Sequence, residues 1–333
     1  MSSNLKNDRR SIAGRVVFSV VVLAVALGIF IYRQELIDQL NFWQYRPSEQ
    51  VSAITERAEL NDRGKFYFYT SRPEIQEREA FNGSCNTQRG ETTVVLGCYV
   101  TQRIYLFNVA DPKLDGIKEV TAAHEMLHAV YERLSAQERE RINDLLQTEA
   151  EKITDAGFIE LMKAYEASEP GERMNELHSI IGTQVATLSP ELESYYARYF
   201  KDRSALAKLY AKYEGVFTDL KNRQTQLANE LNALVEQINQ ATADYNKAVQ
   251  ELNVDVMAFN AKADSGGFAS QAQFNVERNA LIDRQQKIGK DRTEIDGFIA
   301  TYNTKRQQLT EINSQAEALN HSINSNLSPL PSI

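Results

Sequence analysis

The pattern of apolar and polar positions begins with a run of seventeen residues without a charge, from Val16 to Tyr32, VVFSVVVLAVALGIFIY. An α-helix rises about 1.5 Å per residue, so the run reaches about 25 Å, close to the short limit for crossing a bilayer. The pattern therefore predicts a transmembrane helix over residues 16–32, followed by a linker over residues 33–46.

The segment before this run sets the expected orientation, because it carries the basic residues Lys6, Arg9, Arg10 and Arg15. Basic flanks stay in the cytoplasm, so we expect residues 1–15 to be a cytoplasmic tail and the main domains to be extracytoplasmic. A cleaved signal peptide is the alternative, since Ala24 and Ala26 form an A-x-A pair. That pair lies inside the apolar run, whereas a cleavage site follows the run, and this favours a single-pass anchor in the cell membrane.

A second pattern occupies the C-terminal part of the chain, where apolar residues alternate three and four positions apart. One series runs from Tyr210 to Leu252 with only Gln224 polar, and a second series in one heptad phase runs from Phe274 to Ile323. Spacing of this kind is typical of the seam of a coiled coil.

A short break at residues 264–267, DSGG, separates the two series. Two helices of similar length joined by a glycine-containing turn predict an antiparallel coiled-coil hairpin over residues 204–327, with a tail at residues 328–333. The alternative is a parallel oligomer in which each arm pairs with another subunit. Either arrangement could bind a protein partner or self-associate.

The region between anchor and coiled coil, residues 47–203, mixes two kinds of pattern. Residues 48–60 have helical periodicity. Segments rich in aromatic and β-branched residues predict strands, with a hairpin turn at Thr101 and Gln102 between the last two, at residues 65–70, 93–100 and 103–109. From Ile117 onward the pattern is helical, with helix starts at Ser135 and Ser189. This order predicts an α+β fold class with a small sheet.

Composition excludes one broad class of function. The chain has 37 Lys and Arg against 45 Asp and Glu, a net charge of -8, so no basic field is present to bind nucleic acid by counterion release. The two cysteines, Cys85 and Cys98, are too few for a disulfide scaffold and lack the spacing of a zinc knuckle. In an oxidising compartment they can form a disulfide, and a pair of free buried thiols is the alternative.

The candidate chemistry lies in the helical segment at residues 117–134, IKEVTAAHEMLHAVYERL, where His124, Glu125 and His128 form the motif HExxH. On a helix, imidazoles at i and i+4 lie one turn apart on one face and can bind a single ion, while the intervening carboxylate projects beside that face. The chain has only four histidines, and two of them are in this motif, which weakens the alternative of two incidental helix histidines.

Farther along, Asn175, Glu176 and Ser179 form the pattern N-E-x-x-S within ERMNELHSIIG. The HExxH helix and this segment together resemble thermolysin-like gluzincins, a group of zincin metallopeptidases. The segment corresponds to their second helix motif. The resemblance implies a zincin-like domain and a catalytic Zn²⁺ held by His124, His128 and Glu176. It covers these two short helices only.

The chain departs from the gluzincin pattern in two ways. Ile180 stands where an Asp usually follows the Ser, so a carboxylate that orients the first histidine has to come from elsewhere. The interval from His128 to Glu176 is also longer than in the thermolysin-like group. His178 is the rival third ligand, two residues after Glu176 and on roughly the opposite side of the same helix. It could instead be a core histidine or a donor to the oxyanion.

A peptidase of this kind also needs a group that stabilises the tetrahedral oxyanion. The candidates are aromatic residues on the HExxH helix and in ELESYYARYFKDR, namely Tyr131, Tyr195, Tyr196 and Tyr199. In zincins a sheet edge commonly binds extended substrate by added strand pairing, and the strand at residues 103–109 is the expected counterpart here.

Two functions from different classes follow. In the first, the chain is a membrane-anchored zinc metallopeptidase that hydrolyses peptide or protein substrates outside the cytoplasmic membrane, with Glu125 as general base. In the second, it is an envelope scaffold or adaptor that acts through its coiled-coil hairpin, and the zincin-like domain is inactive or structural. Glu125 favours the enzyme, because a structural zinc site needs no base between its histidines.

Overall fold

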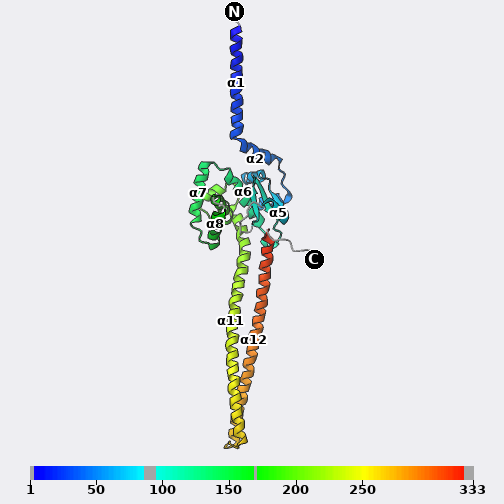
Figure 1. The fold of residues 1–333 in the computed structure, drawn as a ribbon, viewed down its shortest axis with the longest axis vertical. Coiled ribbons are helices and arrows are strands. Elements are labelled where there is room, and N and C mark those ends of the chain that lie inside the picture. Colours follow the sequence, from blue (N-terminus) through cyan, green and yellow to red (C-terminus); the bar gives the residue numbers. More distant parts are fainter. Residues whose placement is uncertain (1–3, 86–94, 169–170, 326–333) are drawn as a thin grey trace. The chain divides into compact units, whose positions relative to one another are not determined.

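The computed structural model describes residues 4–85, 95–168 and 171–325. The chain divides into two compact units, which we call unit 1 (Met1–Val216 with Asn320–Ile333) and unit 2 (Phe217–Leu319). The described residues are mostly helical and contain one three-stranded sheet (Figure 1). The small sheet is confirmed, whereas the α+β class holds only loosely because helices dominate.

The helices of unit 1 follow one another in chain order and are interrupted by the three strands and by one 3₁₀ turn, η1 (Pro112–Leu114). They are α1 (Asn4–Ile31), α2 (Arg33–Gln44), α3 (Glu49–Arg57), α4 (Asp62–Thr70), α5 (Arg78–Ser84), α6 (Ile117–Glu132), α7 (Ala136–Ala150), α8 (Ala156–Ser168), α9 (Arg173–Gln184) and α10 (Pro190–Tyr196). The two long helices are α11 (Arg203–Asp264) and α12 (Gln271–Ile323).

The N-terminal apolar run forms the later part of α1. Among the described residues, no helix alone combines the length and the apolarity of a membrane span, but the pair Val17–Ile31 and Arg33–Gln44, bent by 66°, does so by length and composition. The second member of this pair is α2, so the linker predicted for residues 33–46 is wrong for most of its length. Helix α2 packs against α4, with Phe42 in contact with the rings of Phe66 and Tyr69.

The sheet has the strand order β1-β3-β2, with β1 (Glu74–Gln76) parallel and β2 (Gly97–Val100) antiparallel to β3 (Arg103–Phe107). The predicted hairpin turn is confirmed, since Val100 pairs with Arg103 across Thr101 and Gln102. The strand predicted for residues 93–100 is described only from residue 95, and residues 93 and 94 lie outside the described part. Because β3 is the central strand, β1 and β2 are the two edge strands of the described sheet.

The strand predicted for residues 65–70 is wrong, because these residues form α4. The Asn61 side chain accepts hydrogen bonds from the backbone N–H groups of Arg63 and Gly64, which starts a helix. Gly64 and Phe68, one turn apart, are then both buried. Tertiary packing of the aromatic side chains therefore outweighs their preference for strands.

The core of unit 1 forms where α6 packs against α9, and this contact positions the candidate site. Gly182 on α9 permits a close approach, because a Cβ built there would lie 2.5 Å from Leu127 Cδ1 and 2.6 Å from Tyr196 Cε1. Leu127 on α6 and Leu177 on α9 are fully buried. Leu127 thus lies on the face of α6 that α9 covers.

The predicted helix starts are confirmed. Ser48 caps α3, Ser135 accepts a hydrogen bond from the backbone of Glu138 at 3.2 Å, and Ser189 caps α10 ahead of Pro190. The cysteines are also settled, since Cys85 and Cys98 form a disulfide that joins the end of α5 to β2. The helix caps follow from local sequence, whereas the disulfide was one of two alternatives for the cysteines.

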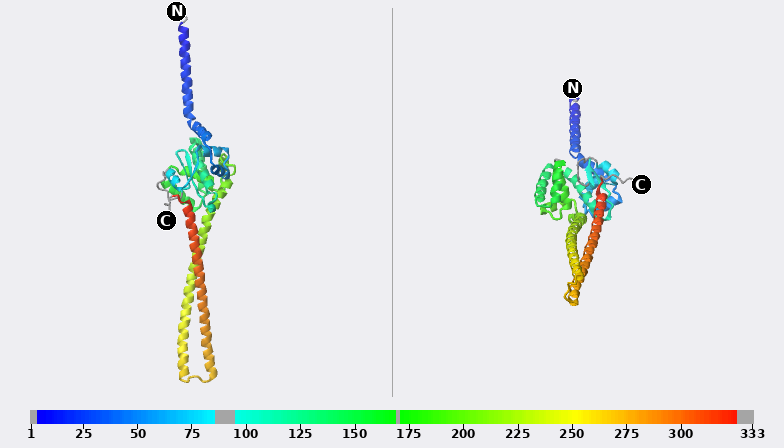
Figure 2. Two further views of the ribbon diagram at one scale, coloured as in Figure 1. Left: turned by 90° about the vertical axis from the view of Figure 1, so that its right-hand side faces the viewer. Right: turned by 60° about the horizontal axis from the view of Figure 1, so that its bottom comes forward.

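Unit 2 is a helical hairpin, as the heptad pattern predicts. Helices α11 and α12 run antiparallel within it (Figure 2), and cross-pairs such as Arg284–Asp255 and Lys305–Glu230 join them. The polar seam residue Gln224 donates a hydrogen bond to Asn313 at 2.8 Å. The chain turns at residues 265–270, close to the predicted break.

Candidate metal centre

Helix α6 presents the two histidines of HExxH side by side. The ring centroids of His124 and His128 are 4.8 Å apart. Helix α9 brings Glu176 to the same point, with its Oε2 3.5 Å from His124 Nε2 and its Oε1 3.5 Å from His128 Nε2. The three ligand atoms all lie within 4.8 Å of one another, so this trio could hold a metal ion.

The chemistry of this trio fits Zn²⁺. Two imidazole nitrogens and one carboxylate oxygen form a donor set typical of catalytic zinc sites. Glu176 Oε2 is buried and has no close hydrogen bond, since His124 Nε2 lies 3.5 Å away. Such a position is costly for a carboxylate unless a cation or another donor satisfies it. An ion among the three side chains would provide that missing partner.

The surroundings of Glu176 keep its carboxyl ionised. Burial raises its pKa, but the charges of His128 and His124 and hydrogen bonds from His124 and Tyr165 act in the opposite direction. Their sum holds the pKa of Glu176 below its ordinary value. The carboxylate is therefore in the form that a metal ligand requires.

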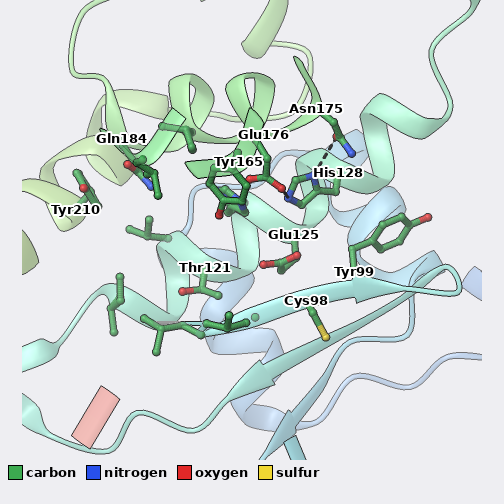
Figure 3. Close-up of a pocket in the computed structure, with 18 of the residues that line it drawn as sticks. Cys98, Tyr99, Thr121, Glu125, His128, Tyr165, Asn175, Glu176, Gln184 and Tyr210 are labelled. Atoms are coloured by element: carbon green, nitrogen blue, oxygen red, sulfur yellow. Dashed lines mark hydrogen bonds and ion pairs between the residues drawn. The ribbon is translucent and has the colours of Figure 1, made fainter. Parts of the chain in front are cut away.

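A series of side-chain hydrogen bonds orients His128. Its Nδ1 lies 2.9 Å from Asn175 Oδ1, shown by the dashed line in Figure 3. Because the amide oxygen only accepts, His128 donates from Nδ1, and its Nε2 is the nitrogen on the side of Glu176 that could bind an ion. The Asn175 amide in turn donates to Glu172 Oε2 at 3.0 Å. The residue that begins the N-E-x-x-S pattern thus orients the second histidine, whereas the departure at Ile180 concerns the first.

Glu125 is the general-base candidate and projects from α6 toward β2 (Figure 3). It is 5% exposed and lies in the wall of the same cavity as the trio. Gly97 on β2 leaves room for it, since a Cβ there would be 2.7 Å from Glu125 Oε1 and 2.6 Å from Thr121 Cγ2. A side chain at this edge of the sheet would displace the carboxylate.

Around this site lies a cavity of about 400 Å³. Besides the trio and Glu125, strand β2 and helices α8, α9 and α11 supply its walls, with Gly97, Cys98, Tyr99, Leu161, Tyr165, Asn175, Gln184, Tyr210 and Tyr213. Sequence reasoning missed Tyr165, which hydrogen-bonds Glu176 from α8. Its segment carries no motif, so only the docking of α8 against α9 reveals it.

The rival ligand His178 lies apart from the trio and does not line this cavity. It is fully buried, and its Nε2 is 2.8 Å from the hydroxyl of Tyr195. Burial, with the nearby charges of His128 and His124, lowers its pKa to about 3, so the imidazole is neutral. The structure therefore places it as the core histidine that was one of the alternatives.

The tyrosines considered as donors to the oxyanion also do not line the cavity. Tyr131 donates its hydroxyl to Asn143 at 2.9 Å. The remaining candidates, Tyr195, Tyr196 and Tyr199, are buried together in an aromatic cluster. The strand proposed for substrate pairing, β3, has partners on both sides, so β2 is the strand whose free edge reaches the cavity.

Comparison of the chain with models of protein families, with characterised proteins and with solved structures gives no match. The site is accordingly assessed on its geometry and chemistry.

Proposed function

We propose that the chain is a zinc-dependent peptidase, anchored in a membrane by residues 16–32, that hydrolyses peptide bonds outside the cytoplasmic membrane. The observation that carries the proposal is the convergence of His124, His128 and Glu176 within 4.8 Å, with Glu125 in the same cavity. A carboxylate between two histidine ligands is required for hydrolysis and has no use in a purely structural zinc site.

Zinc in this trio would supply a Lewis acid that activates water and polarises a carbonyl. Glu125 takes the proton from the attacking water and delivers it to the leaving amine. Its buried position beside Gly97 limits the number of orientations of its carboxylate. Asn175 and Glu172 hold the ring of His128 in one tautomer throughout.

Strand β2 supports a substrate of extended peptide. It is one of the two edge strands of the sheet, and its residues Gly97, Cys98 and Tyr99 line the cavity. A peptide that pairs with this edge gains backbone hydrogen bonds without demands on side-chain identity. Tyr165, whose hydroxyl reaches Glu176, replaces Tyr131 as the proposed donor to the oxyanion.

The decisive experiment measures zinc content and peptide hydrolysis on the full-length protein in detergent. Glu125→Gln should retain zinc and lose hydrolysis, because the amide cannot accept a proton. Glu176→Gln and His124→Ala should lose zinc as well. His321→Ala, at an exposed histidine, is the matched control and should leave both properties unchanged.

Two results would contradict the proposal. An unimpaired Glu125→Gln protein would remove the general base, and zinc retention in Glu176→Gln with loss in His178→Gln would reassign the third ligand. Zinc binding in the wild type without hydrolysis of any peptide would favour the envelope scaffold, in which the hairpin of unit 2 carries the function.

A further inference from the structure

Helix α2 has an apolar face that no part of the described chain covers. The four large residues on it are 48%, 43%, 52% and 63% exposed, namely Leu36, Ile37, Leu40 and Trp43. Their spacing places them on one stripe of the helix. Large apolar side chains that share one exposed face indicate an interaction surface.

The opposite face of α2 packs against the rest of unit 1. Asp38 is 3% exposed and forms an ion pair with Arg133, which follows α6, at 2.7 Å. The backbone carbonyl of Asp38 accepts a hydrogen bond from the Thr70 hydroxyl at 3.0 Å. These contacts fix the rotation of α2 about its axis, so the apolar stripe faces away from unit 1.

The stripe is continuous along the chain with the apolar run of α1. The two helices are separated by one residue, Tyr32, and their axes differ by 66°. If α1 follows the bilayer normal, a bend of this size turns α2 closer to the membrane plane than to the normal. An amphipathic helix in that orientation buries its apolar face at the boundary of headgroups and acyl chains, where tryptophan is favoured.

We propose that α2 is an interfacial helix that binds a lipid bilayer through Leu36, Ile37, Leu40 and Trp43. The inference rests on the anchor proposed for residues 16–32 and is independent of peptidase activity. The membrane then holds unit 1 through a packed helix whose buried Asp38 is paired with the residue after the HExxH helix, Arg133.

The chain provides its own probe, because Trp43 is its only tryptophan. The full-length protein is reconstituted into phosphatidylcholine vesicles, and emission is compared between ordinary lipid and lipid brominated near the headgroup end of its acyl chains. We expect emission at shorter wavelength than in water and strong quenching by the brominated lipid. The triple variant Leu36→Ser, Ile37→Ser, Leu40→Ser should lose both effects. The control Val254→Ser with Met257→Ser, which removes two exposed apolar residues of unit 2, should keep them.

Emission typical of water, quenched by aqueous iodide and unaffected by brominated lipid, would overturn the inference. Short-wavelength emission without quenching by brominated lipid would also overturn it, since protein would then cover the face. An alkaline wash of the same vesicles tests the anchor separately. A chain that stays with the vesicles while Trp43 is unquenched refutes the interfacial helix alone, and a chain that washes off after being quenched supports the helix and refutes the anchor.

Discussion

Units 1 and 2 bury apolar side chains to different depths. In unit 1, residues such as Phe68, Leu127 and Leu177 have no exposed surface. In unit 2, Leu319 at the boundary of the unit is 2% exposed, and the other buried seam residues keep 8–9% of their surface exposed, namely Leu220, Leu227, Leu231, Leu234 and Ile312. Two helices can cover a side chain from one direction only, whereas α6 is covered by helices and a sheet.

Ionisable groups show the same contrast. Buried carboxylates and histidines such as Glu125, His128 and Asp38 belong to unit 1, and among the described residues of unit 2 no charged side chain is buried. The cavity with the candidate metal ligands is lined by residues of the more deeply buried unit 1. Matched substitutions in the two units should therefore change the free energy of unfolding by different amounts.

The largest difference is expected for arginines in ion pairs. Arg133 pairs with Asp38 where both side chains are almost inaccessible, at 7% and 5% exposed. Arg133→Ala leaves Asp38 buried without its cation and should lower the free energy of unfolding of unit 1 by about 3–5 kcal/mol. Denaturant titration measures the loss. A cost within about 1 kcal/mol, as for an exposed pair, would contradict the interpretation of this pair as buried.

A smaller difference is expected for glycines on helices. Gly182→Ala places a methyl group against Leu127 and Tyr196, and overpacking of this kind costs about 1–3 kcal/mol. It should also weaken zinc binding, because α9 carries Glu176. Gly289→Ala on α12 meets no atom within 4 Å and should instead stabilise unit 2 by about 0.5–1 kcal/mol. Amide hydrogen exchange measures the stability of each unit separately. If both substitutions changed stability in the same direction, the expected difference between the units would be contradicted.

The smallest effect is expected for an exposed pair in unit 2. Arg284 and Asp255 are 40% and 50% exposed, so Arg284→Ala should cost about 0.2–1 kcal/mol and less at high salt. Hydrogen exchange of α11 and α12 provides the measurement. A loss as large as that in Arg133→Ala would mean that the hairpin depends on single contacts and not on its seam.

Features that depend on neighbours in sequence were predictable. The HExxH helix, the caps at Ser135 and Ser189, and the heptad seam all arise from spacings within a few turns. Features that depend on distant partners were not. Helix α2 is fixed by Asp38 and Arg133, which are 95 positions apart, and no local pattern announces that pair.

The site divides in the same way. His124 and His128 come from one helix turn, and the motif around Glu176 identifies the third member of the trio. The position of Tyr165 depends on how α8 docks. Strand β3 is central, and not an edge, because β1 pairs with it, and β1 has three residues, which is too short to leave a pattern. The Tyr131 hydroxyl donates to Asn143, which its place on the HExxH helix alone does not determine.

The disulfide between Cys85 and Cys98 affects how the protein should be produced. It closes a loop across 13 positions and contributes about 3 kcal/mol in the chain-entropy account. Since Cys98 is also part of the cavity wall, material expressed in a reducing cytosol would have a slackened strand beside Glu125. Preparations secreted into an oxidising compartment, and purified without thiols that also chelate zinc, are the ones in which the proposed zinc binding and hydrolysis should be measured.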